Sequence, residues 1–375
     1  MPKKSVLFII DNLFEGGAER VLVDMLQAFD YDRYQVTLLV GIPNGVYFND
    51  LPQNVSKIVL FETYWQLQAK RLLFRLYQRF GIDAPLQRYI RHKMHTNFDT
   101  IISFCEGPSM LYHRFLLPFS QNNITWVHTD LVHNAWSKAY FYQQDEQKTY
   151  LAMQKIVCVS NAVKNYFLQL NSGISHERIE VIHNLIPITT IQSKAQQYPS
   201  IRQKPFTIVC VGRLVKEKGF EKIILAASQL HNEGFPVQVW ILGEGPLQKP
   251  LEELIGKLQL GVYIQLFGFV KEPYYYMAQA DLLVNTSSVE GFPVSICEAM
   301  CLGKPIVAFH TDGTVELLEN TTYGMTIEPT LQALVQAIKD LITHPELLAH
   351  YASQSTQRTA IFAPETILPK IYDLI

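Results

Sequence analysis

Two glutamates in one short segment carry the strongest chemical signal in this sequence. Glu290 and Glu298 stand eight positions apart. If Glu298 lies on a helix that begins just after Glu290, the two carboxylates are separated by roughly 8 Å along the helix axis. Carboxylates at that separation can accept hydrogen bonds from hydroxyl groups on two different rings. The spacing therefore favours recognition of a sugar nucleotide over a metal ion, the alternative being two solvated surface residues.

The neighbouring sequence predicts the elements that position these glutamates. The apolar run 282–284 is typical of a buried strand, and Pro293 is typical of the first turn of a helix. We expect that helix to end just before Gly303 and a second strand to cover 305–309. Glu290 would then follow the carboxyl end of a parallel strand, which is where open α/β sheets bind ligands.

The residues between the two glutamates are suited to bind oxygen atoms through the backbone. The first N–H groups of a helix have no intrahelical partner and attract phosphate or hydroxyl oxygens. The residues expected to contact such a ligand are Gly291, Phe292, Pro293, Val294 and Ser295.

A second candidate site is the basic turn that follows the apolar run 206–211. Arg213 and Lys218 lie in this turn, and they could neutralise a diphosphate with a planar fork and a point charge. Lys216 is expected to be exposed. The alternative is a solvated basic loop. Near the N-terminus, Gly16 and Gly17 follow the first apolar run, where glycine allows the backbone to approach a phosphate.

Composition limits the class of protein. The chain has 375 residues, of which 48% are hydrophobic and 18% charged, so we expect two globular domains. A net charge of −2 argues against bulk nucleic-acid binding. The five cysteines are expected to be core residues in a reducing compartment, without a zinc set. No apolar run is long enough for a transmembrane helix, so we expect a cytoplasmic protein.

Apolar and amphipathic segments alternate along the chain. Strands are expected at 5–10, 35–40, 100–104, 124–127, 155–159, 206–211, 237–242 and 262–267. Helices are expected at 18–29, 161–170 and 218–231, with Ser160 capping the second. This alternation predicts parallel sheets with helical crossovers. We expect the polar stretch 189–204 to connect the two domains.

Several motifs together resemble the family-4 retaining glycosyltransferases, which have the GT-B fold. They are the Glu-x7-Glu segment, the Gly-Arg-x4-Lys-Gly turn that starts at Gly212, and the Gly-Gly-Ala-Glu that starts at Gly16. The resemblance implies an α/β fold of two Rossmann-like domains with parallel sheets facing across a cleft. The domains would be an acceptor-binding domain over 1–186, a nucleotide-sugar-binding domain over 187–363, and a C-terminal helix over 364–375 that crosses back to the first.

By this resemblance, particular residues receive functions. Glu290 would contact the transferred sugar and Glu298 the donor ribose, while His128 would approach the reacting carbon from the end of a first-domain strand. Residues expected to bind the donor's phosphates are Arg213, Lys218, Gly16 and Gly17, and the stretch containing Phe269 would cradle the base. Glu106 and Asp130 are the candidates for contacting the acceptor.

The family transfers a sugar with retention of configuration and without a divalent metal. We therefore expect transfer of a hexose or N-acetylhexosamine from a nucleotide diphosphate sugar, expected to be a UDP-sugar. No Asp-x-Asp metal motif is assigned, and neither a metal nor another cofactor is expected. With no nucleophile on the opposite face of the sugar, front-side attack is the expected path, and Glu290 would position sugar hydroxyls.

A basic segment points to the acceptor. From Tyr64 to His95 there are seven Lys or Arg residues and one acid, interleaved with large apolar side chains. One helical face is expected to hold Leu73, Leu76, Tyr77 and Phe80, and a separate charged stripe to hold Arg71, Arg75 and Arg79. Such a helix can lie on an anionic cytoplasmic leaflet. The expected acceptor is then a lipid-linked glycan for a capsule, lipopolysaccharide or similar surface polysaccharide. The alternative is a core-packed helix with solvated arginines.

Two other functions use the same fold. A nucleotide-sugar 2-epimerase also holds a UDP-sugar between two Rossmann-like domains, but it lacks the Glu-x7-Glu segment and has no use for the basic segment. A non-catalytic sugar-nucleotide-binding protein would not require Glu290, Arg213, Lys218 and His128 together.

Overall fold

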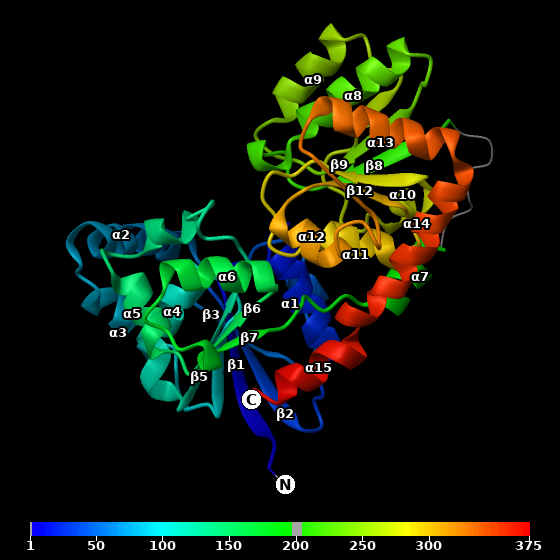
Figure 1. Ribbon diagram of the computed structural model, residues 1–375. Helices are drawn as coiled ribbons and strands as arrows, with labels where there is room; N and C mark the ends of the chain where they lie inside the picture. The colour runs from blue at the N-terminus through cyan, green and yellow to red at the C-terminus, as the bar shows by residue number, and fades with distance from the viewer. Residues whose placement is uncertain (1, 197–204) are drawn as a thin grey trace. The chain divides into compact units, whose positions relative to one another are not determined.

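The structure is a computed structural model that describes residues 2–196 and 205–375. These residues form two compact units, which Figure 1 draws as separate groups of strands and helices. The N-terminal unit contains residues 2–185 and 364–375, and the C-terminal unit contains the described residues of 186–363. Each unit is a parallel sheet flanked by helices, which is the α/β architecture that the alternating pattern predicts.

The described part of the N-terminal unit holds a seven-stranded sheet in the order β3-β2-β1-β4-β5-β6-β7. The strands are β1 (Lys4–Ile10), β2 (Tyr34–Val40), β3 (Ser56–Val59), β4 (Thr100–Ser103), β5 (Asn122–Val127), β6 (Lys155–Cys158) and β7 (Ile179–Val181). The α-helices are α1 (Gly17–Gln27), α2 (Tyr64–Phe80), α3 (Ala84–His92), α4 (Pro108–Leu116), α5 (Asp145–Ala152), α6 (Asn161–Leu170) and α15 (Pro364–Tyr372). Short 3₁₀ turns cover η1 (Phe48–Asp50), η2 (Leu117–Phe119), η3 (Trp136–Tyr140) and η4 (His176–Arg178).

The described part of the C-terminal unit holds a six-stranded sheet in the order β10-β9-β8-β11-β12-β13. The strands are β8 (Thr207–Val211), β9 (Gln238–Leu242), β10 (Ile264–Leu266), β11 (Leu282–Asn285), β12 (Ile306–Phe309) and β13 (Met325–Ile327). The α-helices are α7 (Ile188–Ala195), α8 (Phe220–Asn232), α9 (Gln248–Lys257), α10 (Tyr274–Gln279), α11 (Val294–Cys301), α12 (Asp312–Leu318), α13 (Leu331–Thr343) and α14 (Pro345–Arg358). The 3₁₀ turns are η5 (Lys216–Lys218) and η6 (Thr359–Phe362).

The sheets form because their strands are apolar on both faces. In β8, Ile208 and Cys210 pack with Val239 of β9 and Val307 of β12 in one buried cluster. Such continuous apolar runs are typical of parallel sheets covered on both sides. Each fully buried aliphatic side chain contributes about 1.5–3 kcal/mol to folding, so the sheets are rigid platforms for the loops at their carboxyl ends.

The chain's C-terminal helix packs in the N-terminal unit. The hydroxyl group of Tyr372 in α15 accepts a hydrogen bond from the backbone N–H of Asp30 at 2.8 Å, and its ring stacks on Tyr34 of β2. The Asn122 side chain at the start of β5 donates to the backbone oxygen of Leu374 at 2.8 Å. The last residues of the chain therefore complete the unit that the first residues begin.

Several sequence expectations are confirmed closely, and others are corrected. Helix α6 has the predicted bounds, and the Ser160 hydroxyl accepts from the N–H of Val163 as a cap. The interpretation of 189–204 as a connection is wrong for its first part, because α7 covers 188–195 and buries Ile191 and Ala195. Helix α7 packs against α10 and α11. Without knowledge of these neighbours, the sequence of such a short amphipathic helix resembles that of a polar linker. The remainder, 197–204, lies outside the described residues.

The helix predicted from Lys218 begins later. Residues 216–218 form the turn η5, Gly219 adopts a left-handed φ of +61°, and α8 starts at Phe220. Similarly, α11 starts at Val294 with Pro293 as its N-cap. Gly303 follows the end of α11 with a φ of +63°, as expected of a residue that terminates a helix.

Candidate active site

In the C-terminal unit, Glu290 lies where the sequence places it, just beyond the carboxyl end of β11. Its Oε1 atom is 2.6 Å from Nζ of Lys218, which comes from the turn after β8. The same oxygen accepts a hydrogen bond from the Asn285 side chain at 3.1 Å. Neighbouring strands of the sheet thus bring together two residues that are 72 positions apart in the sequence.

Glu290 is held ionised. Burial acts to raise the pKa of its carboxyl group, but the Lys218 ammonium and hydrogen bonds from Ser287 and Asn285 outweigh it and leave the pKa below its ordinary value. The side chain of Glu290 is 9% exposed and that of Lys218 is 28% exposed. A negative and a positive group are therefore fixed side by side at the edge of the sheet.

Close backbone packing fixes the loops around this pair. A Cβ atom on Gly219 would lie 2.6 Å from the carbonyl oxygen of Thr286, whose hydroxyl group donates to the carbonyl oxygen of Lys218 at 2.9 Å. A Cβ atom on Gly313 would collide with the carbonyl oxygen of Glu290. These glycines allow the loops after β8, β11 and β12 to approach one another.

Other predicted donor-binding residues of the C-terminal unit lie around the same edge. Arg213 is exposed, and its guanidinium group makes no hydrogen bond or ion pair with the described residues. Glu298 lies on α11, is 7% exposed and accepts from the Tyr274 hydroxyl at 3.3 Å. Phe269, partly buried, follows Gly268, whose carbonyl oxygen accepts from the N–H of Gly243 at 2.8 Å.

The segment joining the two glutamates is only partly open to solvent. Phe292 and Pro293 are buried, while Gly291, Val294 and Ser295 are partly exposed. Lys216 is exposed, as expected. Asn285 was not assigned in the sequence analysis, although it directly follows the predicted strand 282–284 and is the last residue of β11. It shares Oε1 of Glu290 with Lys218.

In the N-terminal unit, Glu106 and His128 meet at the carboxyl end of the sheet. Oε1 of Glu106 accepts hydrogen bonds from the backbone N–H groups of His128 and Thr129, each at 2.8 Å. Burial, opposed by these N–H groups, raises the pKa of Glu106 to about 7, and the nearby Glu146 charge adds to the increase. Glu106 therefore changes its charge near neutral pH.

His128 is held in its neutral form. Burial lowers the pKa of its imidazole to about 4, and the ring centroid lies 5.1 Å from that of Phe104. Nε2 of His128 is buried and has no hydrogen-bond partner within residues 2–196 and 205–375. A neutral imidazole with an unsatisfied nitrogen can donate to or accept from a ligand hydroxyl.

Asp130 has a different environment. Its Oδ1 atom accepts from the N–H groups of Val132 and His133, at 2.9 and 3.1 Å, and its Oδ2 atom is 2.6 Å from Nδ1 of His133. The Asp130 carboxylate thus fixes the conformation of its own loop.

Gly16 is the N-cap of α1, which starts at Gly17, and a Cβ atom on Gly16 would collide with the Glu19 carboxylate.

A partly buried charge network that sequence reasoning missed lies at the end of β1. Asp11 follows β1 directly and is 2.7 Å from Nζ of Lys70 on α2. The Tyr112 hydroxyl donates to the same Asp11 oxygen. The available signal was an aspartate placed directly after a predicted strand, a position that His128 also occupies.

The described residues contain no group of three or more His, Cys, Asp or Glu side chains arranged to hold a metal ion. The chain does contain one Asp-x-Asp sequence, Asp30-Tyr31-Asp32, which the sequence analysis did not assign. It lies between α1 and the start of β2, at the opposite end of that strand from its carboxyl edge. Oδ1 of Asp30 accepts from the N–H groups of Asp32 and Arg33.

The burial of side chains on helix α2 partly contradicts the apolar face that was predicted for this segment. Of the four residues assigned to that face, Tyr77 alone is buried, Leu73 and Leu76 are partly exposed, and Phe80 is 60% exposed. The helix instead buries Phe74 and Tyr77, and the Tyr77 hydroxyl donates to Asp145 at 3.1 Å. The stripe of Arg71, Arg75 and Arg79 is exposed. No helix among the described residues combines the length and apolar character needed to cross a bilayer.

Two parallel-sheet α/β units are the architecture of the GT-B class of glycosyltransferases. Residues 15–190 match the description Glycosyltransferase Family 4, and residues 192–358 match Glycosyl transferases group 1. The chain belongs to this glycosyltransferase family.

Relatives extend the comparison. The chain is 23% identical over 373 residues to the amylovoran biosynthesis glycosyltransferase AmsD of Erwinia amylovora, covering 99% of each chain. It is 29% identical over 194 residues to the N-acetylgalactosamine-N,N'-diacetylbacillosaminyl-diphospho-undecaprenol 4-alpha-N-acetylgalactosaminyltransferase of Campylobacter jejuni. That second match spans about half of each chain, 51% and 52%.

Solved structures share the fold. Anabaena HepE in complex with UDP-glucose has a TM-score of 0.75 at 22% identity, covering 99% of this chain and 98% of that one. Staphylococcus aureus TarM also has a TM-score of 0.75, at 14% identity, covering 100% and 99%. These likenesses establish the GT-B fold.

Proposed function

We propose that this protein transfers a hexose or N-acetylhexosamine from a UDP-sugar to a lipid-linked glycan. The transfer would retain the anomeric configuration and need no metal. The observation that carries the proposal is the Lys218–Glu290 pair at 2.6 Å, with the exposed guanidinium of Arg213 in the same loop as Lys218. Cations at this edge suit a diphosphate, and a fixed carboxylate suits sugar hydroxyls.

The proposed chemistry assigns each group a step. The bond between the anomeric carbon and the diphosphate oxygen breaks, while the acceptor oxygen bonds to the same face of that carbon. The acceptor proton passes to the leaving phosphate oxygen. Arg213 and Lys218 stabilise the negative charge that grows on the diphosphate, and this electrostatic stabilisation is the main contribution of the protein. Glu290 orients the sugar, and neutral His128 bonds to a hydroxyl near the reacting carbon.

The donor and acceptor classes are supported by the relatives' names. The Campylobacter relative is named for a diphospho-undecaprenol acceptor and an N-acetylgalactosaminyl group, and AmsD is named for amylovoran biosynthesis. The HepE structure contains UDP-glucose. We infer that the present protein acts in surface polysaccharide assembly, with a UDP-sugar as its donor.

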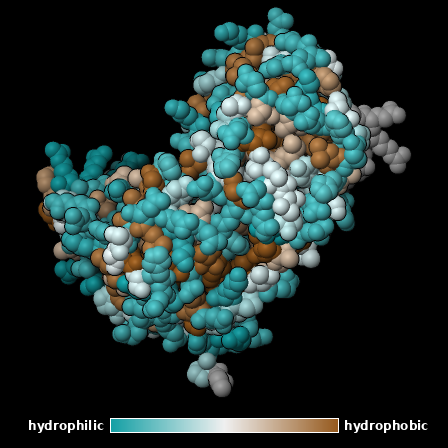
Figure 2. Space-filling view, viewed as in Figure 1, coloured by the Kyte–Doolittle hydropathy of each residue, from teal (hydrophilic) through white to brown (hydrophobic). Residues whose placement is uncertain are grey.

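A lipid-linked acceptor requires a way to reach the membrane surface. On α2, Trp65 is 79% exposed and Leu72 is 60% exposed, beside the arginine stripe of residues 71, 75 and 79. Figure 2 shows hydrophobic residues next to hydrophilic ones at the end of the N-terminal unit where α2 lies. We propose that this face rests on the anionic cytoplasmic leaflet, with aromatics at the headgroup level and arginines on lipid phosphates.

The first experiment is a thermal-shift screen of the purified chain against UDP, GDP, ADP and their sugars, with and without EDTA. A nucleotide at 100 times its dissociation constant should stabilise the protein by about 2.7 kcal/mol. We expect stabilisation by UDP that EDTA leaves unchanged and that Lys218→Ala reduces. No response to any nucleotide would contradict the donor site.

The epimerase alternative is separated by product analysis. A UDP-sugar incubated with the protein and no acceptor should stay unchanged for a transferase, whereas a 2-epimerase would convert it to its C2 epimer. A binding protein would produce neither that epimer nor a glycosylated lipid acceptor.

A further inference from the structure

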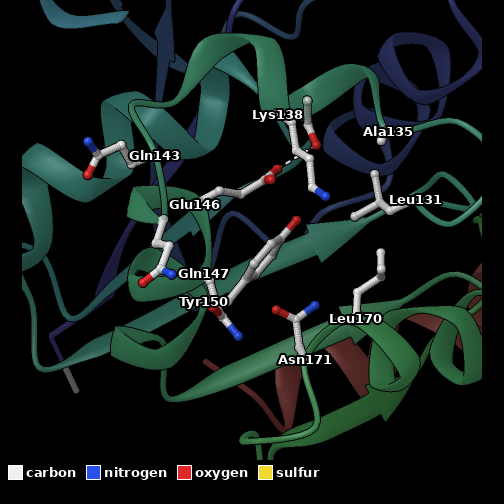
Figure 3. Close-up of a pocket in the computed structure, with 11 residues that line it drawn as sticks. Leu131, Ala135, Lys138, Gln143, Glu146, Gln147, Tyr150, Leu170 and Asn171 are labelled. Atoms are coloured by element: carbon white, nitrogen blue, oxygen red, sulfur yellow. Dashed lines mark hydrogen bonds between the residues drawn. The ribbon is translucent and has the colours of Figure 1, made fainter. Parts of the chain in front are cut away.

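A cavity in the N-terminal unit is lined by residues that have no role in the proposed function. It has a volume of about 220 Å³ and is bounded by the loop after β5, the helix α5 and the end of α6 (Figure 3). One ordered water needs only about 10–15 Å³, whereas drug-sized ligands occupy sites of about 300–1,000 Å³. The cavity therefore suits a ligand of intermediate size, such as one sugar ring.

The hydroxyl group of Tyr150 in the wall of this cavity lacks a partner. Tyr150 is 2% exposed, and its hydroxyl oxygen forms no hydrogen bond within the described part of the chain. Figure 3 shows this hydroxyl directed toward Glu146 and Lys138, which also line the cavity. Buried polar groups are nearly always satisfied, so an unsatisfied one calls for an explanation. A ligand that supplies the missing hydrogen bond is such an explanation.

The remaining walls combine planar polar groups with aliphatic ones. The Glu146 carboxylate already accepts from the Ser137 hydroxyl, and the Asn171 amide comes from the end of α6. Leu131 and Leu170 supply apolar surface. Carboxylate, amide and hydroxyl groups on an aliphatic floor match the hydroxyls and C–H groups of a neutral sugar.

The cavity is connected electrostatically to the acceptor side of the site. The charge of Glu146 raises the pKa of Glu106, which bonds to the backbone of His128. Glu146 thus lies close enough for its charge to change the pKa of Glu106, the carboxylate that we assign to the acceptor. A sugar in the cavity and an acceptor hydroxyl near Glu106 can belong to one oligosaccharide.

We propose that this cavity binds a neutral sugar unit of the acceptor glycan, with Tyr150, Glu146 and Asn171 bonding to its hydroxyl groups. The proposal rests on the proposed function in that it takes the acceptor to be a glycan. It adds a specificity site for a sugar that is not the one receiving the transferred group.

The test is direct binding without any donor. Saturation-transfer NMR on the full chain would use free glucose, galactose, rhamnose, N-acetylglucosamine and N-acetylgalactosamine as probes. We expect at least one sugar to bind weakly and Tyr150→Phe to weaken it about two- to tenfold, the effect of losing one hydrogen bond. Glu180→Gln is the matched control, because this partly exposed carboxylate on β7 pairs with Lys155 and does not line the cavity; the change should leave the binding unchanged.

A stability measurement checks the variant itself. Tyr150→Phe removes an unpaired hydroxyl, so its thermal midpoint should equal or exceed that of the parent. Tyr112→Phe removes a hydroxyl that donates to Asp11, so its midpoint should fall. A marked fall for Tyr150→Phe would show that the hydroxyl has a partner in the free protein and would overturn the argument.

The outcomes separate the two proposals. If no sugar binds, or if Tyr150→Phe binds the sugars as the parent does, the cavity proposal fails even when UDP still stabilises the protein. If a sugar binds through Tyr150 but no nucleotide stabilises the chain, the transferase proposal fails, and the cavity stands as a sugar site but not as a site for the acceptor.

Discussion

Nζ of Lys218 lies 2.6 Å from Oε1 of Glu290, and the two residues come from loops that follow the adjacent central strands β8 and β11. In the proposed function, the pair places the carboxylate that we assign to the sugar directly beside the cation that we assign to the phosphates. A nucleotide diphosphate sugar carries its sugar and its phosphates in the same adjacent arrangement. The contact is therefore the structural basis of the proposed donor site.

Removing Lys218 should affect both stability and donor binding. Lys218→Ala leaves the Glu290 carboxylate buried without its cation, and we expect a loss of about 2 kcal/mol, since partial exposure of Lys218 reduces the cost of a broken buried pair. Urea unfolding measures this loss, and UDP-dependent stabilisation should fall as well. Lys216→Ala, an exposed lysine of the same turn, is the control and should change neither quantity. In a double-mutant cycle with Glu290→Gln, a coupling energy near zero would contradict an energetically important pair.

The Glu106 carboxyl should make stability depend on pH. Its folded pKa is raised to about 7 from an ordinary value of 4.5, so the folded state binds more protons between these values. The stability that the protonated Glu106 carboxyl contributes at low pH is therefore lost as the pH rises toward 7. Glu106→Gln should abolish this loss and be about 2–3 kcal/mol more stable than the parent at pH 8, with no such advantage below pH 4. Denaturant unfolding across this pH range provides the measurement, with the exposed Glu177→Gln as control. A difference that is constant with pH would mean that Glu106 titrates normally.

A single methyl group should test whether the Glu290 loop needs its observed position. Gly313→Ala introduces a Cβ that collides with the carbonyl oxygen of Glu290, so the loop must move and nucleotide affinity should fall by about tenfold or more. Gly256→Ala is the matched control, because that helical glycine of α9 has open space around its Cβ position. It should raise stability by about 0.5–1 kcal/mol and leave affinity unchanged. Unchanged affinity in Gly313→Ala would show that the donor does not depend on this loop.

The exposed face of α2 should bind anionic vesicles. Replacing Arg71, Arg75 and Arg79 with Gln should reduce binding to phosphatidylglycerol vesicles by about 3 kcal/mol in total, at about 1 kcal/mol for each arginine. Co-sedimentation at low and high salt measures the effect, and binding to neutral vesicles should be weak throughout.

The charge-matched control for this experiment is in the other unit. Replacing the exposed Lys216, Lys249 and Lys257 with Gln removes the same net charge. If both triple variants lose binding equally, the attraction depends on net charge alone, and the proposal that α2 is the membrane-binding face is wrong.

The sequence by itself determined the strand-helix alternation, the family motifs and the residues at strand ends. These follow from local rules, because apolar runs, caps and glycines act within a few residues of one another. Ser160 as a helix cap and Glu290 beyond a strand are examples in which the local pattern was sufficient.

Only the tertiary structure decided which distant residues meet and which helix faces are covered. Lys218 was predicted to bind phosphate, but its contact with Glu290 depends on β8 and β11 being neighbours. The α2 face was misassigned because periodicity shows that a helix is amphipathic without showing which neighbours cover it. Phe74 and Tyr77 are buried, whereas Phe80 is exposed. The unsatisfied hydroxyl of Tyr150 is likewise a property of packing, since a sequence does not show where hydrogen-bond partners are absent.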